Sequence, residues 1–255
     1  MDKRLAEEKS APWMSVPRWA AANALTLAIV CTALELLAGV GYRLGWWSLG
    51  NGFLLLRYAA YGSIAAALLA FADLSLFVQS RRAVWMAALA LIIGAAGAGV
   101  PAYYLYRGQH APAIHDITTD TTDPPRFVDA VALRKDAPNP LEYRGASLAG
   151  LQKKHYPDIA PVMLDVPPPE AFTRALAAAH AMGWAIISEV PGDLRIEATD
   201  TTLLFGFKDD VVIRVRPAEQ GSRVDVRSVS RIGLSDLGTN ARRIRSYLKE
   251  LQSRR

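Results

Sequence analysis

Basic, hydroxyl and acidic side chains gather where the last predicted strand leads into the last predicted helix, between Arg227 and Asn240. A helix N-terminus offers free N–H groups, and guanidinium groups add charge-assisted hydrogen bonds, so this pattern is typical of an anion site. The candidate ligands are a phosphorylated or carboxylated small molecule, a lipid headgroup or an acidic envelope protein. The candidate residues are Arg214, Arg227, Ser228, Ser230, Arg231, Ser235, Asp236, Asn240 and Arg243.

The same residues allow two other interpretations. The first, which the sequence favours over an anion site, is a buried arginine–aspartate network that joins sheet to helix, with Asp200, Asp225 and Asp236 as partners. The second is an enzyme with Ser228 or Ser230 as the nucleophile, which would need a positioned base. The four histidines are remote from this segment in sequence, and no nucleophile elbow, phosphate-binding loop, dinucleotide fingerprint or zinc-protease motif occurs. The sequence therefore favours binding over catalysis.

A weaker group of candidates lies earlier in the chain. His115, Asp116 and Asp120, followed by Asp123, have side chains that bind metal ions. No second ligand motif follows downstream, which favours an extended tether whose Asp and Thr side chains bond to local backbone in turns. We therefore expect neither a metal nor a cofactor.

Three long apolar stretches precede the polar part of the chain. They run from about Ala20 to Tyr42, from Tyr58 to Val78 and from Ala83 to Tyr106, and each has aromatic residues near its ends. A spanning helix needs about 20 mostly apolar residues, and aromatic rings favour the headgroup layer. The sequence therefore predicts a three-helix transmembrane anchor over residues 18–107, embedded in a lipid bilayer.

Orientation is predicted from Lys and Arg, which are enriched in cytoplasmic segments. Six basic residues flank one side and three flank the other: Lys3, Arg4, Lys9, Arg18, Arg81 and Arg82 against Arg43, Arg57 and Arg107. This bias places the N-terminal tail, residues 1–17, in the cytoplasm. Three crossings then place everything after Arg107 outside, which in a bacterium is the periplasmic side of the inner (plasma) membrane.

Two carboxylates lie within the predicted spans. Glu35 and Asp73 are costly in lipid unless they are neutral or hydrogen-bonded, and such residues often mark proton or ion pathways. At about 1.5 Å per residue, Glu35 lies about 6 Å outward of its span centre and Asp73 about 7 Å inward. They are therefore not expected to share a proton or an ion, and Arg57 is a candidate partner for Glu35.

The third span is rich in small residues. Gly94, Gly97 and Gly99 let helices approach closely, either within the chain or between copies of it in a homo-oligomer. Pro101 is expected to bend or end this helix.

After Arg107 the chain reads as a polar tether, residues 108–125, followed by a folded domain, residues 126–255. Period-two alternation predicts strands near residues 184–190, 194–199, 211–216 and 223–227, with Asp209 and Asp210 in a hairpin turn. Helical patterns cover residues 167–183 and 236–251, and a stretch from Lys135 to Pro161 is predicted to be irregular. The predicted fold is α+β: an antiparallel sheet with two helices on one face.

Composition excludes several classes of partner and site. The net charge of +5 suggests nucleic acid, but much of the excess lies beside the spans and the polar domain alternates Arg with Asp and Glu, so we expect no nucleic-acid partner. Cys31 is the only cysteine, and it lies in the first span. An intrachain disulfide and a cysteine-based zinc or iron–sulfur site are therefore excluded.

Four stretches of the polar part resemble a single family. They are residues 115–120 with 123–125, 196–200, 205–214 and 225–244. Together they resemble the uncharacterised family catalogued as domain of unknown function 1499, over roughly Ala111 to Leu251. The resemblance implies a domain that also occurs in membrane-anchored forms. No activity is established for that family, so the resemblance implies no catalytic residue.

The leading hypothesis from the sequence is a non-enzymatic envelope protein. Three helices anchor a periplasmic α+β domain that binds a ligand or a partner. One alternative is an enzyme of unknown class that uses the segment from Arg227 to Asn240. Another is a small proton- or ion-coupled transport subunit that uses Glu35 and Asp73.

Overall fold

The computed structural model describes residues 19–76 and 80–254. The chain separates between Tyr106 and Arg107 into two compact units, and each is described by itself. The predicted cytoplasmic tail, residues 1–17, lies outside the described residues.

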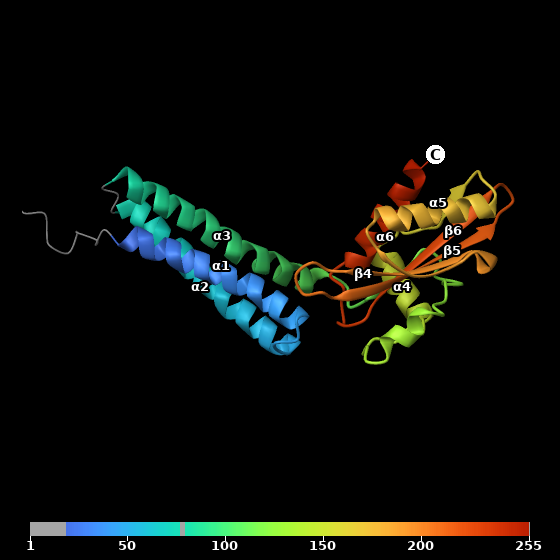
Figure 1. Ribbon diagram of the computed structural model, residues 1–255, viewed down its shortest axis with the longest axis horizontal. Coiled ribbons are helices and arrows are strands. Elements are labelled where there is room, and N and C mark those ends of the chain that lie inside the picture. Colours follow the sequence, from blue (N-terminus) through green and yellow to red (C-terminus); the bar gives the residue numbers. More distant parts are fainter. Residues whose placement is uncertain (1–18, 77–79, 255) are drawn as a thin grey trace, which may run out of the picture. The chain divides into compact units, whose positions relative to one another are not determined.

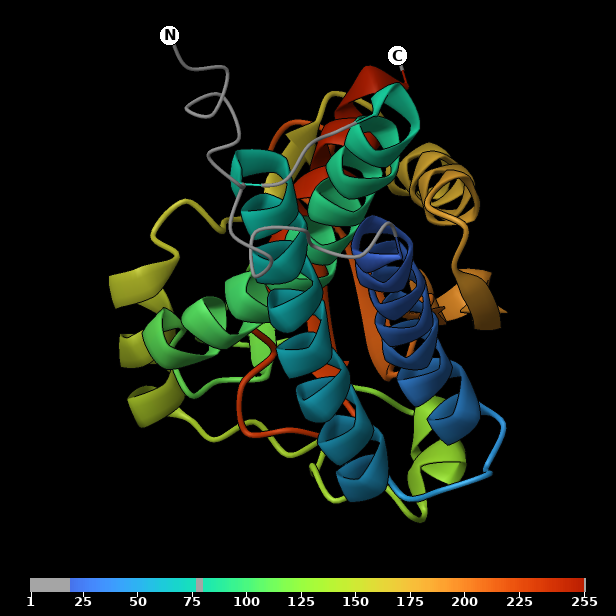
Figure 2. The same ribbon diagram turned by 90° about the vertical axis from the view of Figure 1, so that its left-hand side faces the viewer.

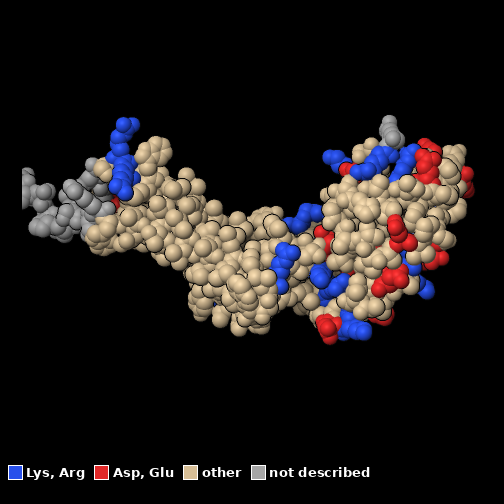
Figure 3. Space-filling model, viewed as in Figure 1, with Lys and Arg blue, Asp and Glu red and all other residues tan. Residues whose placement is uncertain are grey.

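The first unit is built from three helices that are long and apolar enough to cross a membrane. They are α1 (Ala20–Arg43), α2 (Leu49–Leu76) and α3 (Arg81–His110), and they run side by side (Figure 1, Figure 2). On the face shown in Figure 3, charged side chains on these helices gather near their ends. The three helices therefore fit the predicted membrane anchor.

Two helix limits differ from the predicted ones. Helix α2 begins at Leu49 rather than Tyr58, because Arg57 continues the helix and donates a hydrogen bond to Tyr61 one turn later. Helix α3 continues through Pro101 to His110. A proline within a helix removes one N–H donor, and here that loss does not end the helix.

Small residues bring the three helices close together. A Cβ added at Gly62 of α2 would lie 2.3 Å from the Cys31 sulfur of α1, and one added at Gly94 of α3 would lie 2.8 Å from the Ser63 carbonyl oxygen of α2. Gly99 faces open space. The glycine-rich face of α3 therefore packs, at Gly94, against α2 of the same chain.

The second unit is an α+β domain around one antiparallel sheet. The strand order is β1-β6-β5-β4-β3, and β2 also pairs with β6. The elements are β1 (Asp116–Thr118), η2 (Ala130–Arg134), α4 (Ala146–His155), β2 (Val162–Leu164), α5 (Pro168–Ala181), β3 (Ala185–Val190), η3 (Pro191–Asp193), β4 (Arg195–Thr201), β5 (Lys208–Pro217), β6 (Ser222–Ser230) and α6 (Thr239–Ser253).

Helices α5 and α6 lie on one side of the strands, as predicted (Figure 1). Alternate strand residues such as Ile196 and Val226 form a core with Phe172 of α5 and Ile244 of α6. The rings of Trp184 and Tyr247 stack within this core with their centroids 5.1 Å apart. We call this side of the sheet the helix face.

The other side of the sheet, here called the outer face, is covered by the segment from Thr119 to Leu141. Phe127 and Ala130 of this segment pack on Val212 and Val229 of the sheet. The backbone N–H groups of residues 128 and 130 donate to the buried Glu197 carboxylate at 2.7 and 2.8 Å. The face that alternation predicts to be wetter is therefore largely covered as well.

Three predictions for the polar part are wrong. The predicted tether contains β1, whose three buried residues pair with β6, and a strand this short carries no readable alternation. Asp209 and Asp210 are not turn residues, because they pair with β4 and β6 within β5. The stretch predicted to be irregular contains α4. The hairpin turn lies earlier, where Thr202 accepts the Phe207 N–H through its side chain and Gly206 adopts a φ of +67°.

Candidate functional site

The candidate segment after Arg227 is divided between the two faces of the sheet. Successive side chains of a strand point to opposite faces. Ser228 and Ser230 therefore lie on the helix face, where they contact Asn240 of α6. Arg227 and Arg231 lie on the outer face, where they pair with Asp116 and Asp210. The predicted residues do not form a single site.

On the helix face, Asn240 organises the two serines. Its side-chain oxygen accepts a hydrogen bond from Ser228 at 2.7 Å, and its side-chain nitrogen donates to Ser230 and to the His115 carbonyl, both at 2.9 Å. Asn240 and Ser228 are fully buried, and Ser230 is 5% exposed. An asparagine is no general base, so this geometry fits a structural role for both serines.

The same face holds the arginine–aspartate network that the sequence allowed. Arg243 donates to Asp200 at 2.7 Å and to Asp209 at 2.6 Å. Asp236 precedes the helix and accepts the N–H groups of Gly238 and Asn240 at 2.8 and 2.6 Å. Burial raises the pKa of Asp236 despite these hydrogen bonds. The free N–H groups expected to bind an anion are thus already occupied by a carboxylate of the chain.

Ser235 lies beside this network. Its hydroxyl donates to the Pro112 carbonyl at 2.8 Å and accepts the Leu237 N–H at 3.2 Å. It therefore joins the segment before β1 to the loop before α6.

On the outer face, Arg227 is enclosed on every side. It makes two hydrogen bonds to Asp116, at 2.9 and 2.7 Å, and its guanidinium carbon lies 5.4 Å from the ring centroids of both Phe127 and Tyr143. The Arg227 side chain is only 3% exposed. It is therefore a buried structural ion pair and not an open anion site.

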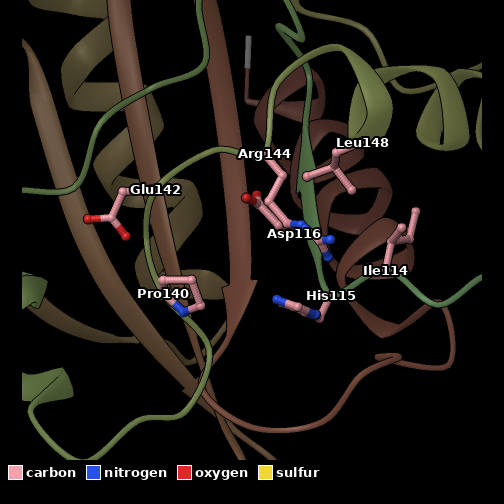
Figure 4. A pocket seen from close by; sticks show the side chains of 7 residues that line it. All are labelled: Ile114, His115, Asp116, Pro140, Glu142, Arg144 and Leu148. Carbon is pink, nitrogen blue, oxygen red and sulfur yellow. The ribbon is translucent and has the colours of Figure 1, made fainter.

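Two cavities of the polar domain differ greatly in size. The first lies beside Asp116 and has a volume of about 10 Å³, room for one water molecule; it is lined by Ile114, His115, Asp116, Pro140, Glu142, Arg144 and Leu148 (Figure 4). The second is a depression of about 510 Å³ near the β5–β6 turn, where Asp165 is the one ionisable lining residue. Neither assembles basic groups around a ligand-sized space.

Asp210 holds two arginines on the outer face. It is fully buried and accepts hydrogen bonds from Arg134 at 2.6 Å, from Arg231 at 3.0 and 2.8 Å, and from Thr199 at 2.6 Å. Burial alone would raise the pKa of Asp210, but the bonds from Arg231, Thr199 and Arg134 outweigh it and lower that pKa. Arg231 is therefore part of a structural ion pair and is not available to bind an anion.

Three other arginines on the outer face are partly open to solvent. The side chains of Arg214, Arg216 and Arg223 are 19%, 35% and 33% exposed, and we call them the arginine cluster. Arg216 and Arg223 lie opposite each other on β5 and β6, while Arg214 lies opposite Asp225. All three contact the buried carboxylate of Asp225, at 3.3, 3.0 and 2.9 Å respectively.

Two carboxylates of the covering segment complete the arginine cluster. Asp120 bonds to Arg216 at 3.1 Å and to Arg223 at 2.7 Å. Burial by itself would raise the pKa of Asp120, but the N–H groups of Asp123 and Thr122 and the two arginines lower it. Asp123 bridges Arg214 and Arg216 through one oxygen, at 3.1 and 2.9 Å, and is 57% exposed.

The arginine cluster also contains an unused hydrogen-bond donor. The Nε–H of Arg214 is buried and has no hydrogen-bond partner among the described residues. A buried donor without an acceptor is costly. The cluster therefore combines a donor that lacks an acceptor with a carboxylate that water can reach.

Sequence reasoning placed Arg214 and Arg216 on a strand beside the candidate segment but missed Arg223. The sequence contains a signal for the arginine cluster. Arg214 and Arg216 are two residues apart on β5, and Arg223 lies opposite Arg216 on β6. Side chains two residues apart share a face, so two hairpin-linked strands bring these charges together. This pairing can be predicted only when the register of β5 and β6 is known, and the position of the turn between them sets that register.

The metal candidates of the sequence are bound to other groups. Asp116 pairs with Arg227, Asp120 pairs with the arginine cluster, and the His115 ring nitrogen lies 3.4 Å from the Leu234 carbonyl oxygen. Among residues 19–76 and 80–254, no three His, Cys, Asp or Glu side chains come together as metal ligands.

The two carboxylates in the apolar helices lie apart. Glu35 of α1 accepts a hydrogen bond from Ser63 of α2 at 2.7 Å, and both residues are buried. Arg57, the expected partner, instead bonds to Tyr61 at 3.1 Å. Asp73 lies ten residues beyond Ser63 on the same helix, about 15 Å further along its axis. The two carboxylates are too far apart to share a proton or an ion.

Fold and site together define a class: an α+β domain with a charged sheet face, carried by a chain whose N-terminal helices fit a membrane anchor. The chain belongs to the family described as protein of unknown function (DUF1499), whose model matches residues 116–251. This match confirms the resemblance seen in the sequence and begins at the first residue of β1. A comparison with curated proteins found no match.

Proposed function

We propose that this protein is an envelope protein whose C-terminal domain binds a carboxylate-bearing ligand at the arginine cluster, without catalysing a reaction. One observation carries the proposal: the exposed Asp123 carboxylate bridges the guanidinium groups of Arg214 and Arg216. These two arginines therefore already hold a carboxylate in the geometry that a ligand would need.

A ligand carboxylate binds by replacing Asp123. Once Asp123 turns away, three guanidinium groups face the two remaining carboxylates of Asp120 and Asp225, and the site is positively charged. An exposed ion pair contributes only about 0.2–1 kcal/mol. Asp123 is therefore a weak internal competitor that a ligand with several carboxylates can displace.

The unused donor of Arg214 supports binding of a second oxygen atom. Its buried Nε–H lacks an acceptor among the described residues. A hydrogen bond from a charged donor contributes about 1.5–3 kcal/mol. A ligand oxygen that accepts this hydrogen bond would therefore make an interaction that the Asp123 side chain does not make.

The proposal includes an extracytoplasmic position for the domain. The bias of Lys and Arg toward the N-terminal tail and the start of α3, which contains Arg81 and Arg82, supports a cytoplasmic N-terminus. With three crossings, the domain then lies outside the cytoplasm, on the periplasmic side in a bacterium. Carboxylate ligands on that side reach the domain without crossing the membrane that holds the helices.

Binding has more support than the two alternatives. The serines needed for an enzyme are buried against Asn240. The basic side chain bonded to Ser228 is the Arg243 guanidinium, which donates to the hydroxyl oxygen at 3.2 Å and has no acceptor with which to take its proton. A transport pathway would need polar groups in series, but Glu35 and Asp73 are separated along the helices.

The test is a calorimetric titration of the full-length protein in lipid nanodiscs with citrate at low salt. Citrate is expected to bind, and the Asp123→Asn variant is expected to bind it about 1.4- to 5-fold more tightly, because an exposed ion pair no longer competes. Arg216→Gln is expected to weaken binding about tenfold or more. Arg245→Gln is the matched control, since it removes a similarly exposed arginine that pairs with the exposed Asp158.

The outcome separates a site from general charge attraction. If Arg245→Gln weakens citrate binding as much as Arg216→Gln does, the arginine cluster is not the site. If neither the native protein nor Asp123→Asn binds citrate, the proposal is wrong.

A further inference from the structure

The two most exposed large apolar side chains among the described residues belong to the polar domain. Leu203 is 88% exposed and Leu234 is 83% exposed. Both values exceed that of Trp85, which is 74% exposed on an apolar helix that fits a membrane span. Single exposed leucines are common on soluble surfaces, but two leucines this exposed on neighbouring loops require an explanation.

Both leucines lie at the same end of the sheet. Leu203 lies in the β4–β5 loop, residues 202–207, and Leu234 lies in the loop after β6, residues 231–238. The register pairs Thr201 with Lys208 and Asp209 with Ser230, so the two loops leave the sheet side by side. We call them the leucine loops. The first also contains the rings of residues 205 and 207, stacked with their centroids 5.3 Å apart.

The chain enters the domain at this same end. Ile114 and Pro112, which precede β1, accept hydrogen bonds from Asp236 at 3.2 Å and from Ser235 at 2.8 Å. These donors are the first two residues after Leu234. The leucine loops are thus bonded directly to the segment that leaves α3.

The covalent path keeps these loops near the lipid. Helix α3 ends at His110, and its last aromatic residue is Tyr106, a residue type that marks the headgroup layer. From Tyr106 to Pro112 the chain advances six residues, a span of at most about 20 Å. For any orientation of the domain, Leu234 therefore stays close to the membrane that holds α3.

We propose that the leucine loops insert into the headgroup–acyl boundary of the membrane that holds the apolar helices. Leucine and aromatic side chains favour that layer, and a nearby basic group adds attraction to anionic lipids. Lys208, the first residue of β5, is exposed beside the loops and supplies such a charge. This surface is distinct from the arginine cluster and binds lipid whether or not a carboxylate ligand binds elsewhere.

Docking at the leucine loops determines how the domain presents its other end. Arg216 lies eight residues along β5 from Lys208, which is about 27 Å at 3.4 Å per residue. The arginine cluster is then presented away from the lipid surface.

The proposal is tested by spin-label accessibility in the full-length protein, reconstituted at one copy per nanodisc with anionic lipid. In a Cys31→Ala background, single labels are placed by Leu203→Cys, Leu234→Cys and, as the control, Met163→Cys. Met163 is also an exposed apolar residue, at 55%, but it pairs with Arg223 at the opposite end of the sheet.

Labels at 203 and 234 are expected to collide more with oxygen and less with a water-soluble nickel chelate than the label at 163. This pattern requires lipid contact. Equal access of the nickel chelate to all three labels would show that the loops lie in water and would overturn the proposal. Exclusion of both reagents at 203 and 234 would overturn it too, because a protein surface would then cover the loops.

Discussion

Replacing Asp210 with asparagine tests whether the buried ionic network stabilises the domain. The Asp210 carboxylate is fully buried and accepts hydrogen bonds from Arg134, Arg231 and Thr199. The side chains of the two arginines are only 4% and 15% exposed. Asparagine keeps the shape but is neutral and offers one acceptor oxygen, so two enclosed guanidinium groups lose their countercharge.

The expected cost follows from this enclosure. Removing one partner of a buried ion pair costs about 3–5 kcal/mol. The free energy of unfolding of a protein is only about 5–15 kcal/mol, so this loss is a large part of it. Asp158→Asn is the matched control. Asp158 also makes two hydrogen bonds to one arginine, Arg245, at 2.5 and 2.7 Å, but these side chains are 55% and 40% exposed. Its loss is expected to cost about 0–1 kcal/mol.

The same carboxylate predicts a pH dependence of stability. Its pKa is lowered in the folded protein, mainly by hydrogen bonds from Arg231, Thr199 and Arg134 acting against burial. A lowered pKa contributes stability that is fully present above the unfolded value, about 3.9, and is lost as pH falls through the folded value. Asp210→Asn removes this part of the acid sensitivity.

The assay is urea unfolding of the full-length protein in detergent, at neutral and at acidic pH. Pulse proteolysis measures the fraction of the polar domain that is unfolded at each urea concentration. The midpoint is expected to fall strongly for Asp210→Asn and little for Asp158→Asn. Equal losses for the two variants, or a loss below about 1 kcal/mol for Asp210→Asn, would refute the assignment of stability to buried ion pairs.

Two further predictions concern the helix face and the membrane helices. Burial raises the pKa of Asp236, so its contribution to the pH dependence of stability is opposite in sign to that of Asp210. The domain becomes more stable as pH falls through the raised pKa. Asp236→Asn should remove this gain in stability in the same urea assay. Gly97→Val should destabilise the three-helix unit by about 1–3 kcal/mol, because an added Cβ lies 2.6 Å from the Ser63 hydroxyl, whereas Gly99→Val, with open space around it, should be neutral. Thermal melting in detergent, followed by circular dichroism, measures both glycine variants, and similar melting temperatures would contradict the packing.

Elements with a long periodic signal were predictable from the sequence. The three apolar helices and the strands β3 to β6 follow from apolar length and from alternation, and helix α5 follows from its prolines and the glycine beyond it. The short elements were not predictable. Strands β1 and β2 have three residues each and are fixed by their pairing with β6, a tertiary contact that leaves no local pattern.

The candidate site was only partly predictable, for a related reason. Grouping Arg227, Ser228 and Arg231 by nearness in sequence ignored that a strand sends neighbours to opposite faces. The placement of Asp210 in a turn hid the carboxylate that neutralises Arg231. The arginine cluster depends on the covering segment, because Asp123 reaches Arg214 across a sequence separation of 91 residues. Such a contact is set by tertiary packing and not by spacing.

The central claim is that Arg214 and Arg216 form a carboxylate site that Asp123 occupies until a ligand arrives. A crystal structure of the full-length protein with citrate tests it most directly. We predict a citrate carboxylate within hydrogen-bond distance of both guanidinium groups, with the Asp123 side chain turned away into solvent. A structure in which Asp123 still bridges the two arginines at saturating citrate, with citrate elsewhere or absent, would contradict the claim.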